Sequence, residues 1–438
     1  MRFFIRSAAL AAAMVLFFAA CDSARQNGKT ANDPTQQGGG QDDDHSQQGG
    51  GQDDAQDGEN VLLAEDCAAL DLDPDESVTL RVGEAQAASS DSEAVRLSGS
   101  GQDLTVTGLR PGGCASITLT SKDGTNVIPV FVRSRKKSEV SERYGLYADR
   151  AVPPYDHQNV QNINIYKSIE NIHFFIEAPD YLSSGELKTT CYDPHLVPHI
   201  TAQYDAVLKK DVFAFSLHYS PDKDPWREND GDMNSGGSDR QRLELKTMIN
   251  ASPANMYSTG GGDTFTYRWK FKLAENFAAS PEFTHIHQIK PEGADSSSAV
   301  ITLTPRLKGN GAVMQLIYSG AARPDGAASA LSYLCEEPLS GFLGEWVYVE
   351  ETISYGEPAA YAFKALRLRD LAPLMQYTYD SAAYTAEDPF VTYRPGNTYA
   401  RAKFGFYRRI VSGGEPVREL SNPTETILYA DIELEKHL

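Results

Sequence analysis

The sequence predicts an all-β protein in which a small β-sandwich is followed by a large β-jelly-roll. Short segments alternate apolar and polar residues with the two-residue period of a strand, and turn-forming residues separate them. The 438 residues include 22 Tyr and 18 Phe, which favour strands over helices. From residue 143 to 438 the strand-like segments follow one another without regular helices between them, which favours two packed antiparallel sheets, that is, a concanavalin-like sandwich.

The chain begins with a segment typical of export. Two arginines occur in the first six residues, residues 8–20 are apolar, and Cys21 follows. The residues Phe18-Ala-Ala-Cys21 resemble a bacterial lipobox, which implies that residues 1–21 are a lipoprotein signal peptide and that Cys21 carries a lipid. The resemblance implies an outer-membrane lipoprotein that faces the periplasm or the cell surface. Ordinary secretion is the alternative.

Residues 22–60 predict a flexible linker. They are rich in Gln, Gly and Asp, and the octamer at residues 36–43 recurs at residues 47–54. Such a segment has too little apolar surface to offset the entropy lost on ordering, and its carboxylates repel one another. We therefore expect this linker to hold the rest of the chain away from the membrane.

Residues 61–137 predict the small β-sandwich. Alternating strands are expected at residues 77–82, 103–109, 114–120 and 127–132. The stretch from Leu104 to Leu119 resembles the immunoglobulin-like domains of bacterial surface proteins. A spacer between anchor and main domain is the simplest interpretation, and a sugar-binding module is the alternative.

Charge and cysteine content restrict the partners. The net charge of −20 argues against nucleic acid, and it allows an anionic ligand only where the site is locally basic. Besides Cys21, the spacing favours one disulfide inside each globular part, and free thiols are the alternative. The paired residues would be Cys67 with Cys114 and Cys191 with Cys335. No cysteine or histidine spacing indicates zinc.

Three strand-like segments of residues 143–438 carry polar side chains where a buried sheet would need apolar ones. Their alternation predicts one face with Arg240, Arg242, Glu244 and Lys246, one with His285 and His287, and one with Arg401, Lys403 and Tyr407. Gln288 and Lys290 are expected on the face opposite the two histidines. A solvated strand face is the simplest explanation for each segment alone.

These segments carry a resemblance to a known group of enzymes. Arg242-Leu-Glu-Leu-Lys246, His285-Ile-His-Gln288 and Lys403-Phe-Gly-Phe-Tyr-Arg408 are similar, in this order, to the motifs of jelly-roll polysaccharide lyases. These are the alginate lyases of family 7, the glucuronan lyases and the heparin lyase I type. The resemblance covers the C-terminal two thirds of the chain. It implies cleavage of a uronate polysaccharide by β-elimination, without a cofactor.

The resemblance also implies roles for individual residues. Tyr407 would be the acid, and also the base if nearby cations favour its phenolate. His287 would be the base or a partner of the substrate carboxylate, and Arg242 and Lys403 would neutralise that carboxylate. The families have Gln-x-His where this chain has His285-Ile-His287, so His285 replaces the glutamine or a bulge brings Gln288 to the site. Further substrate-binding candidates are Arg240, Arg401, Glu244, Lys246 and Lys290.

The sequence also allows two other functions and a metal site. A lipid-anchored glycan-binding protein could keep the same basic sheet without turnover. A glycoside hydrolase would need two carboxylates at the site, for which Glu350 and Glu351 are the candidates, although neighbouring residues point to opposite faces. The acidic residues 222–232 could hold a structural calcium ion, although they lack the spacing of a known calcium loop. We expect a monomer.

Overall fold

The structure is a computed structural model that describes residues 61–83, 85, 87–150, 174–178, 199–218, 239–247, 262–293, 298–320, 331–356, 359–379, 390–394, 396–412, 415–417 and 424–438. Residues 61–438 form one compact unit. The predicted lipidation site Cys21, the linker and the candidate calcium segment 222–232 lie outside the described residues and remain predictions. Within the described ranges, no helix is both long enough and apolar enough to cross a bilayer.

The small N-terminal part consists of two four-stranded sheets. In spatial order, the first contains β1 (Val61–Leu63), β3 (Ser77–Arg81), β6 (Asp103–Gly108) and β5 (Val95–Ser100). The second contains β2 (Leu70–Leu72), β8 (Gly124–Val132), β7 (Cys114–Ser121) and β4 (Ala87–Ser90). Their inward-facing side chains, such as Leu80, Val106 and Ile117, are fully buried in one hydrophobic cluster. The four strands expected here are present as β3, β6, β7 and β8, and β1, β2, β4 and β5 were not expected.

The disulfide expected between Cys67 and Cys114 is not formed. Cys67, Cys114 and Cys335 are free thiols, and Cys191 lies outside the described residues. Cys67 hydrogen-bonds the carbonyl oxygen of Ala69 at 3.4 Å and packs against the core of the small part. Cys114 packs against a different cluster, so the two thiols face different surroundings. Burial raises the pKa of each of these three thiols above its ordinary value.

Residues 140–438 contain two large sheets. The seven-stranded sheet contains, in spatial order, β10 (Phe174–Glu177), β13 (Arg240–Thr247), β22 (Asn397–Arg409), β15 (Thr284–Gly293), β16 (Ile301–Lys308), β17 (Gly311–Ser319) and β18 (Leu331–Pro338). The eight-stranded sheet contains β11 (Ile200–Asp205), β12 (Lys210–His218), β25 (Thr424–His437), β14 (Thr264–Leu273), β19 (Trp346–Ser354), β20 (Tyr361–Arg367) and β21 (Pro373–Tyr379), with β9 (Val140–Leu146) paired to β25. Short elements are β23 (Val411–Ser412), β24 (Glu415–Pro416) and the 3-10 helices η2 (Lys137–Glu139) and η5 (Leu339–Gly341).

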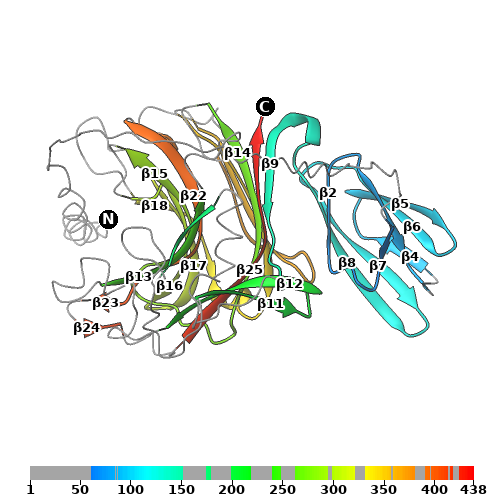
Figure 1. Cartoon of the computed structure of the whole chain (residues 1–438), viewed down its shortest axis with the longest axis horizontal. Helices are drawn as coiled ribbons and strands as arrows, with labels where there is room; N and C mark the ends of the chain where they lie inside the picture. The colour runs from blue at the N-terminus through cyan, green and yellow to red at the C-terminus, as the bar shows by residue number, and fades with distance from the viewer. Residues whose placement is uncertain are drawn as a thin grey trace, which may run out of the picture. The chain divides into compact units, whose positions relative to one another are not determined.

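The two large sheets form the layers of a jelly-roll sandwich (Figure 1). Apolar side chains from the inner faces of both sheets form one cluster, to which β22 contributes Phe404 and Phe406, and β14 contributes Trp269. Because side chains alternate along a strand, burying one face leaves the other face of the seven-stranded sheet for polar residues. The predicted all-β fold class and jelly-roll are thereby confirmed.

The small part contacts the outer face of the eight-stranded sheet. The Phe131 and Tyr348 rings stack with centroids 3.8 Å apart. Arg133 pairs with Glu433 at 3.0 Å, and Lys270 of β14 pairs with Asp71 at 3.1 Å. A segment that acted only as a spacer would not need to bury an aromatic ring and several charges against its neighbour.

Candidate functional site

The outer surface of the seven-stranded sheet carries a set of polar residues that we call the polar face. It consists of Glu177 on β10; Arg240, Arg242, Glu244 and Lys246 on β13; Arg401, Lys403 and Tyr407 on β22; and His285, Gln288 and Lys290 on β15. Strand pairing aligns these residues in rows, because residues directly opposite each other project to the same side. One row places Tyr407 between Arg242 and His285, and another places Lys403 between Lys246 and Gln288.

Tyr407 has two cationic neighbours. Arg240 Nη1 donates a hydrogen bond to the phenolic oxygen at 2.9 Å. The guanidinium carbon of Arg242 lies 4.3 Å from the centre of the Tyr407 ring. Since both groups are positive, each would stabilise negative charge developing on the phenolic oxygen. Of the three residues to which the resemblance gave central roles, Arg242 and Tyr407 lie together on the polar face.

His285 lies on the other side of Tyr407. The two ring centroids are 6.0 Å apart, and Phe283 stacks on His285 at 4.9 Å. Its Nδ1 is 2.7 Å from the hydroxyl oxygen of Thr304 on β16. Burial, helped by nearby Arg306, Lys290 and Arg240, lowers the pKa of His285 to about 3, so the imidazole is neutral at ordinary pH.

His287 does not share the face of His285, which corrects the expectation from alternation. The pairing between β15 and β22 shifts register between these two histidines, so that His285 lies opposite Tyr407 while His287 lies opposite Phe404. His287 enters the core, where its ring is 4.4 Å from that of Trp269. It pairs with Glu351 at 2.7 Å, and both side chains are 0% exposed. His287 therefore has no path to a substrate on the polar face.

The same bulge brings Gln288 and Lys290 to the polar face, opposite Lys403 and Arg401. Of the two arrangements that the sequence left open, this is the one in which Gln288 reaches the site. The Gln288 amide donates a hydrogen bond to Glu244. The placement of Gln288 and Lys290 on the face opposite His285 was wrong for the same reason as for His287.

Glu177 is a residue of the site that the sequence interpretation missed. Its carboxylate accepts hydrogen bonds from Lys246 at 2.6 Å and from Lys403 at 2.7 Å, and Arg242 approaches to 3.7 Å. Burial opposes its ionisation, but Lys403, Arg242 and Lys246 outweigh burial and hold the pKa of Glu177 well below its usual range. The sequence did contain a signal for it. Side chains alternate along the strand Phe-Phe-Ile-Glu177, which could have indicated that Glu177 points away from the core.

Accessibility separates the cations of the polar face into two groups. The Arg242 side chain is 27% exposed, whereas that of Lys403 is 6% exposed and is also 3.4 Å from Glu244. Arg401 is paired with Glu292. Arg242 is therefore better placed than Lys403 to contact a ligand, and Lys403 supports the arrangement from beneath.

The polar face is locally basic although the chain is acidic. It carries six cationic side chains, from Arg240, Arg242, Lys246, Lys290, Arg401 and Lys403. Against these stand two carboxylates of the face, Glu177 and Glu244, and two that pair with its arginines, Glu292 with Arg401 and Asp239 with Arg240. This excess of positive charge meets the condition under which an acidic protein can bind an anionic ligand.

Gly405 lies between Lys403 and Tyr407 and has a structural role. Its φ is +136°, and a Cβ placed there would be 2.1 Å from the carbonyl oxygen of Leu243 on the neighbouring strand. A glycine in a strand can admit a ligand close to the backbone. The structure gives a different reason, because a side chain here would collide with β13.

The two carboxylates considered for a glycoside hydrolase, Glu350 and Glu351, do not face a common site. Glu350 bonds Arg268 at 2.8 Å on the outer side of the eight-stranded sheet. Glu351 faces the core, where Tyr361 donates to it at 2.7 Å. The expectation that they point to opposite faces is confirmed, and neither belongs to the polar face, so this pair cannot serve a glycosidase there.

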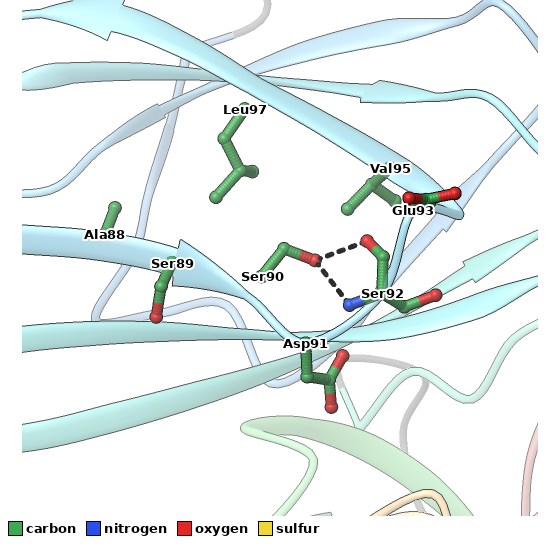
Figure 2. Close-up of a pocket in the computed structure, with 8 residues that line it drawn as sticks. All are labelled: Ala88, Ser89, Ser90, Asp91, Ser92, Glu93, Val95 and Leu97. Atoms are coloured by element: carbon green, nitrogen blue, oxygen red, sulfur yellow. Dashed lines mark hydrogen bonds between the residues drawn. The ribbon is translucent and has the colours of Figure 1, made fainter.

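A separate depression of about 450 Å³ lies in the small part, between β4 and β5 (Figure 2). Ser90 at its centre bonds the backbone of Ser92 in the connecting loop. Its lining contains neither an aromatic ring nor a cation, so it offers no support for the sugar-binding alternative. No group of His, Cys, Asp and Glu in the described part of the chain is arranged to hold a metal ion.

Comparisons with known proteins find only distant structural similarity. No protein-family model matches the sequence, and no curated protein matches it. Among solved structures, it is similar to an endo-β-1,4-glucuronan lyase from the fungus Trichoderma reesei, with 13% identity, a TM-score of 0.34, and coverage of 54% of this chain and 86% of that one. It is similar to the family 7 alginate lyase AlgAT5, with 14% identity, a TM-score of 0.35, and coverage of 62% and 99%. For an alginate lyase from Klebsiella pneumoniae the values are 11%, 0.32, 53% and 83%. At such values the similarity decides nothing about activity, which depends on the side chains of the polar face.

Proposed function

We propose that the chain is a polysaccharide lyase that cleaves an anionic, uronate-containing polysaccharide by β-elimination. The observation that carries this proposal is the Tyr407 phenol, which contacts two arginines and adjoins a neutral histidine on a locally basic face. An elimination needs a group that takes the C5 proton, a group that protonates the leaving oxygen and a partner for the uronate carboxylate. The polar face offers a candidate for each.

The carboxylate partner comes first in the chemistry, because the C5 proton is acidic only when the adjacent carboxylate is neutralised. Arg242, whose side chain is 27% exposed and whose guanidinium lies over the Tyr407 ring, can form charge-assisted hydrogen bonds to that carboxylate, while Arg240 bonds the Tyr407 oxygen. Gln288 can add an amide donor by exchanging its bond to Glu244 for one to the substrate. Glu177 and Glu244 keep the remaining cations in position.

The proton transfers then fall to His285 and Tyr407. Neutral His285 accepts the C5 proton, and its affinity for that proton rises when the anionic uronate offsets the surrounding cations. The electron pair of the C5–H bond forms the C4–C5 double bond, and the C4–O4 bond breaks. Tyr407 donates its proton to the departing 4-oxygen, while Arg240 stabilises the phenolate that forms.

A glycan-binding protein without turnover is the second candidate. The position of His287 favours it, because the histidine expected to be the base is buried against Glu351. In this candidate the cations of the polar face hold the polymer and Tyr407 is a binding residue only.

The test is absorbance of the unsaturated uronate while the protein is mixed with alginate, glucuronan, heparin-type, chondroitin-type and pectic polymers. The test variant is Tyr407→Phe, which removes the phenolic hydroxyl group. The matched control is Tyr399→Phe, which makes the same change on the same strand. We expect absorbance to rise with one polymer class. The rate of this rise should be at least about 100-fold lower in Tyr407→Phe and should be unchanged in the control. Binding without any rise would replace the lyase by the glycan-binding candidate, and a rise unaffected by Tyr407→Phe would refute the site.

A further inference from the structure

The contacts of His285 with β16 determine which of its two ring nitrogens carries the proton. Its Nδ1 is 2.7 Å from the hydroxyl oxygen of Thr304. Thr304 in turn donates its hydroxyl proton to the oxygen of Thr302 at 3.3 Å. Both threonines are buried. Because Thr304 directs its single hydroxyl proton to Thr302, it accepts at His285, which assigns the ring proton to Nδ1.

The protonation state of the ring completes this assignment. Arg240, Lys290 and Arg306 face His285 from β13, β15 and β16, and together with burial they keep the imidazole neutral. A neutral imidazole has one N–H, and with the proton on Nδ1 the Nε2 keeps a free lone pair. Strand β15 lies between β16, which holds Thr304, and β22, which holds Tyr407. The nitrogen turned away from Thr304 is thus the one available to the reacting groups.

We propose that Thr304 is a positioning residue that holds His285 in the Nδ1–H tautomer and thereby makes Nε2 the proton acceptor of the site. Thr302 contributes to the same effect, because it accepts the hydrogen bond from Thr304. The Thr304 hydroxyl would otherwise be free to donate to Nδ1. The tautomer itself is a property of the free protein. Its catalytic consequence rests on the lyase function proposed above.

The decisive measurement is the pair of imidazole ¹⁵N chemical shifts of His285 in the full chain labelled at histidine nitrogen. The signal is assigned by its absence in His285→Gln. We expect a protonated Nδ1 and an unprotonated Nε2 in the unmodified protein and in Thr304→Ser, which keeps the hydroxyl. In Thr304→Val, which keeps the shape and removes the hydroxyl, we expect the Nε2–H tautomer to become dominant.

Kinetics give the second readout. Thr304→Val should lower kcat by about 10- to 100-fold with little change in KM, the range known for groups that orient metal-binding histidines, and Thr304→Ser should restore most of it. An Nε2–H or doubly protonated His285 in the unmodified protein would overturn the proposal even if the protein is an active lyase. Conversely, the protein could show the expected ¹⁵N chemical shifts and yet cleave no polymer. That result would confirm the tautomer and refute the proposed lyase function.

Discussion

Glu177→Gln is the substitution that most directly tests the electrostatics of the polar face. The change keeps the size of the side chain and removes the charge that faces Lys246, Lys403 and Arg242. Among the described residues, Lys403 then keeps one carboxylate partner, Glu244, at 3.4 Å. Burial already holds the pKa of Lys246 below its ordinary value, so the loss of Glu177 makes its charged form less favourable still.

The expected cost follows from burial. Breaking a fully buried ion pair costs about 3–5 kcal/mol. The Glu177 side chain is 17% exposed and the glutamine oxygen can still accept a hydrogen bond, so we expect about 2–3 kcal/mol of unfolding free energy at pH 7. The control is Glu336→Gln on the same sheet, whose partner Lys308 is 2.5 Å away and exposed, and which should cost less than about 1 kcal/mol.

The dependence on pH gives this prediction a definite sign. Because the folded pKa of Glu177 is depressed, its contribution is fully present above the unfolded value of about 4.3 and is lost as pH falls through the folded pKa. Urea unfolding of the unmodified protein and of Glu177→Gln between pH 7 and pH 3 measures this contribution. The difference between them should shrink below about pH 4. A difference that stays constant, or one no larger than that of the control, would refute the reasoning.

Two further substitutions test the backbone and the packing. Gly405→Ala should lower the free energy of unfolding by at least about 3 kcal/mol. The control is Gly311→Ala, which has a similar φ of +129° but open space around it and should therefore lower this free energy clearly less. Equal losses of stability in thermal unfolding would mean that the collision with Leu243 plays no part. Phe131→Ala removes the stacking on Tyr348 and should cost about 3–5 kcal/mol, with the small part melting before the jelly-roll in calorimetry, and an unchanged single transition would contradict it.

The sequence was sufficient for those features that depend on alternation within one strand. The faces of β13 and β22 are those expected, because Leu243 and Leu245, or Phe404 and Phe406, have to enter the core together. All-β architecture follows from the same pattern repeated along the chain.

The errors occurred where the outcome depends on pairing between strands. The register shift that turns His287 into the core and Gln288 outward is set by how β15 pairs with β22, and neither strand encodes it alone. Glu177 is remote in sequence from the cations it holds, so only the placement of β10 beside β13 reveals its role. The disulfide expectation failed because the order of cysteines along the chain says nothing about which core each thiol joins.

The packing of the small part on the jelly-roll affects how truncated versions of this chain should be interpreted. Tyr348 and Lys270 are covered in part by Phe131 and Asp71, so a chain that begins at residue 143 would expose the Tyr348 ring to water and would leave Lys270 with Asp431 as its carboxylate partner. Such a fragment would be prone to aggregate or to lose its native sheet. A drop in activity after deleting residues 61–137 would therefore not show that they touch the polysaccharide, and point substitutions that leave this contact intact are the appropriate way to ask that question.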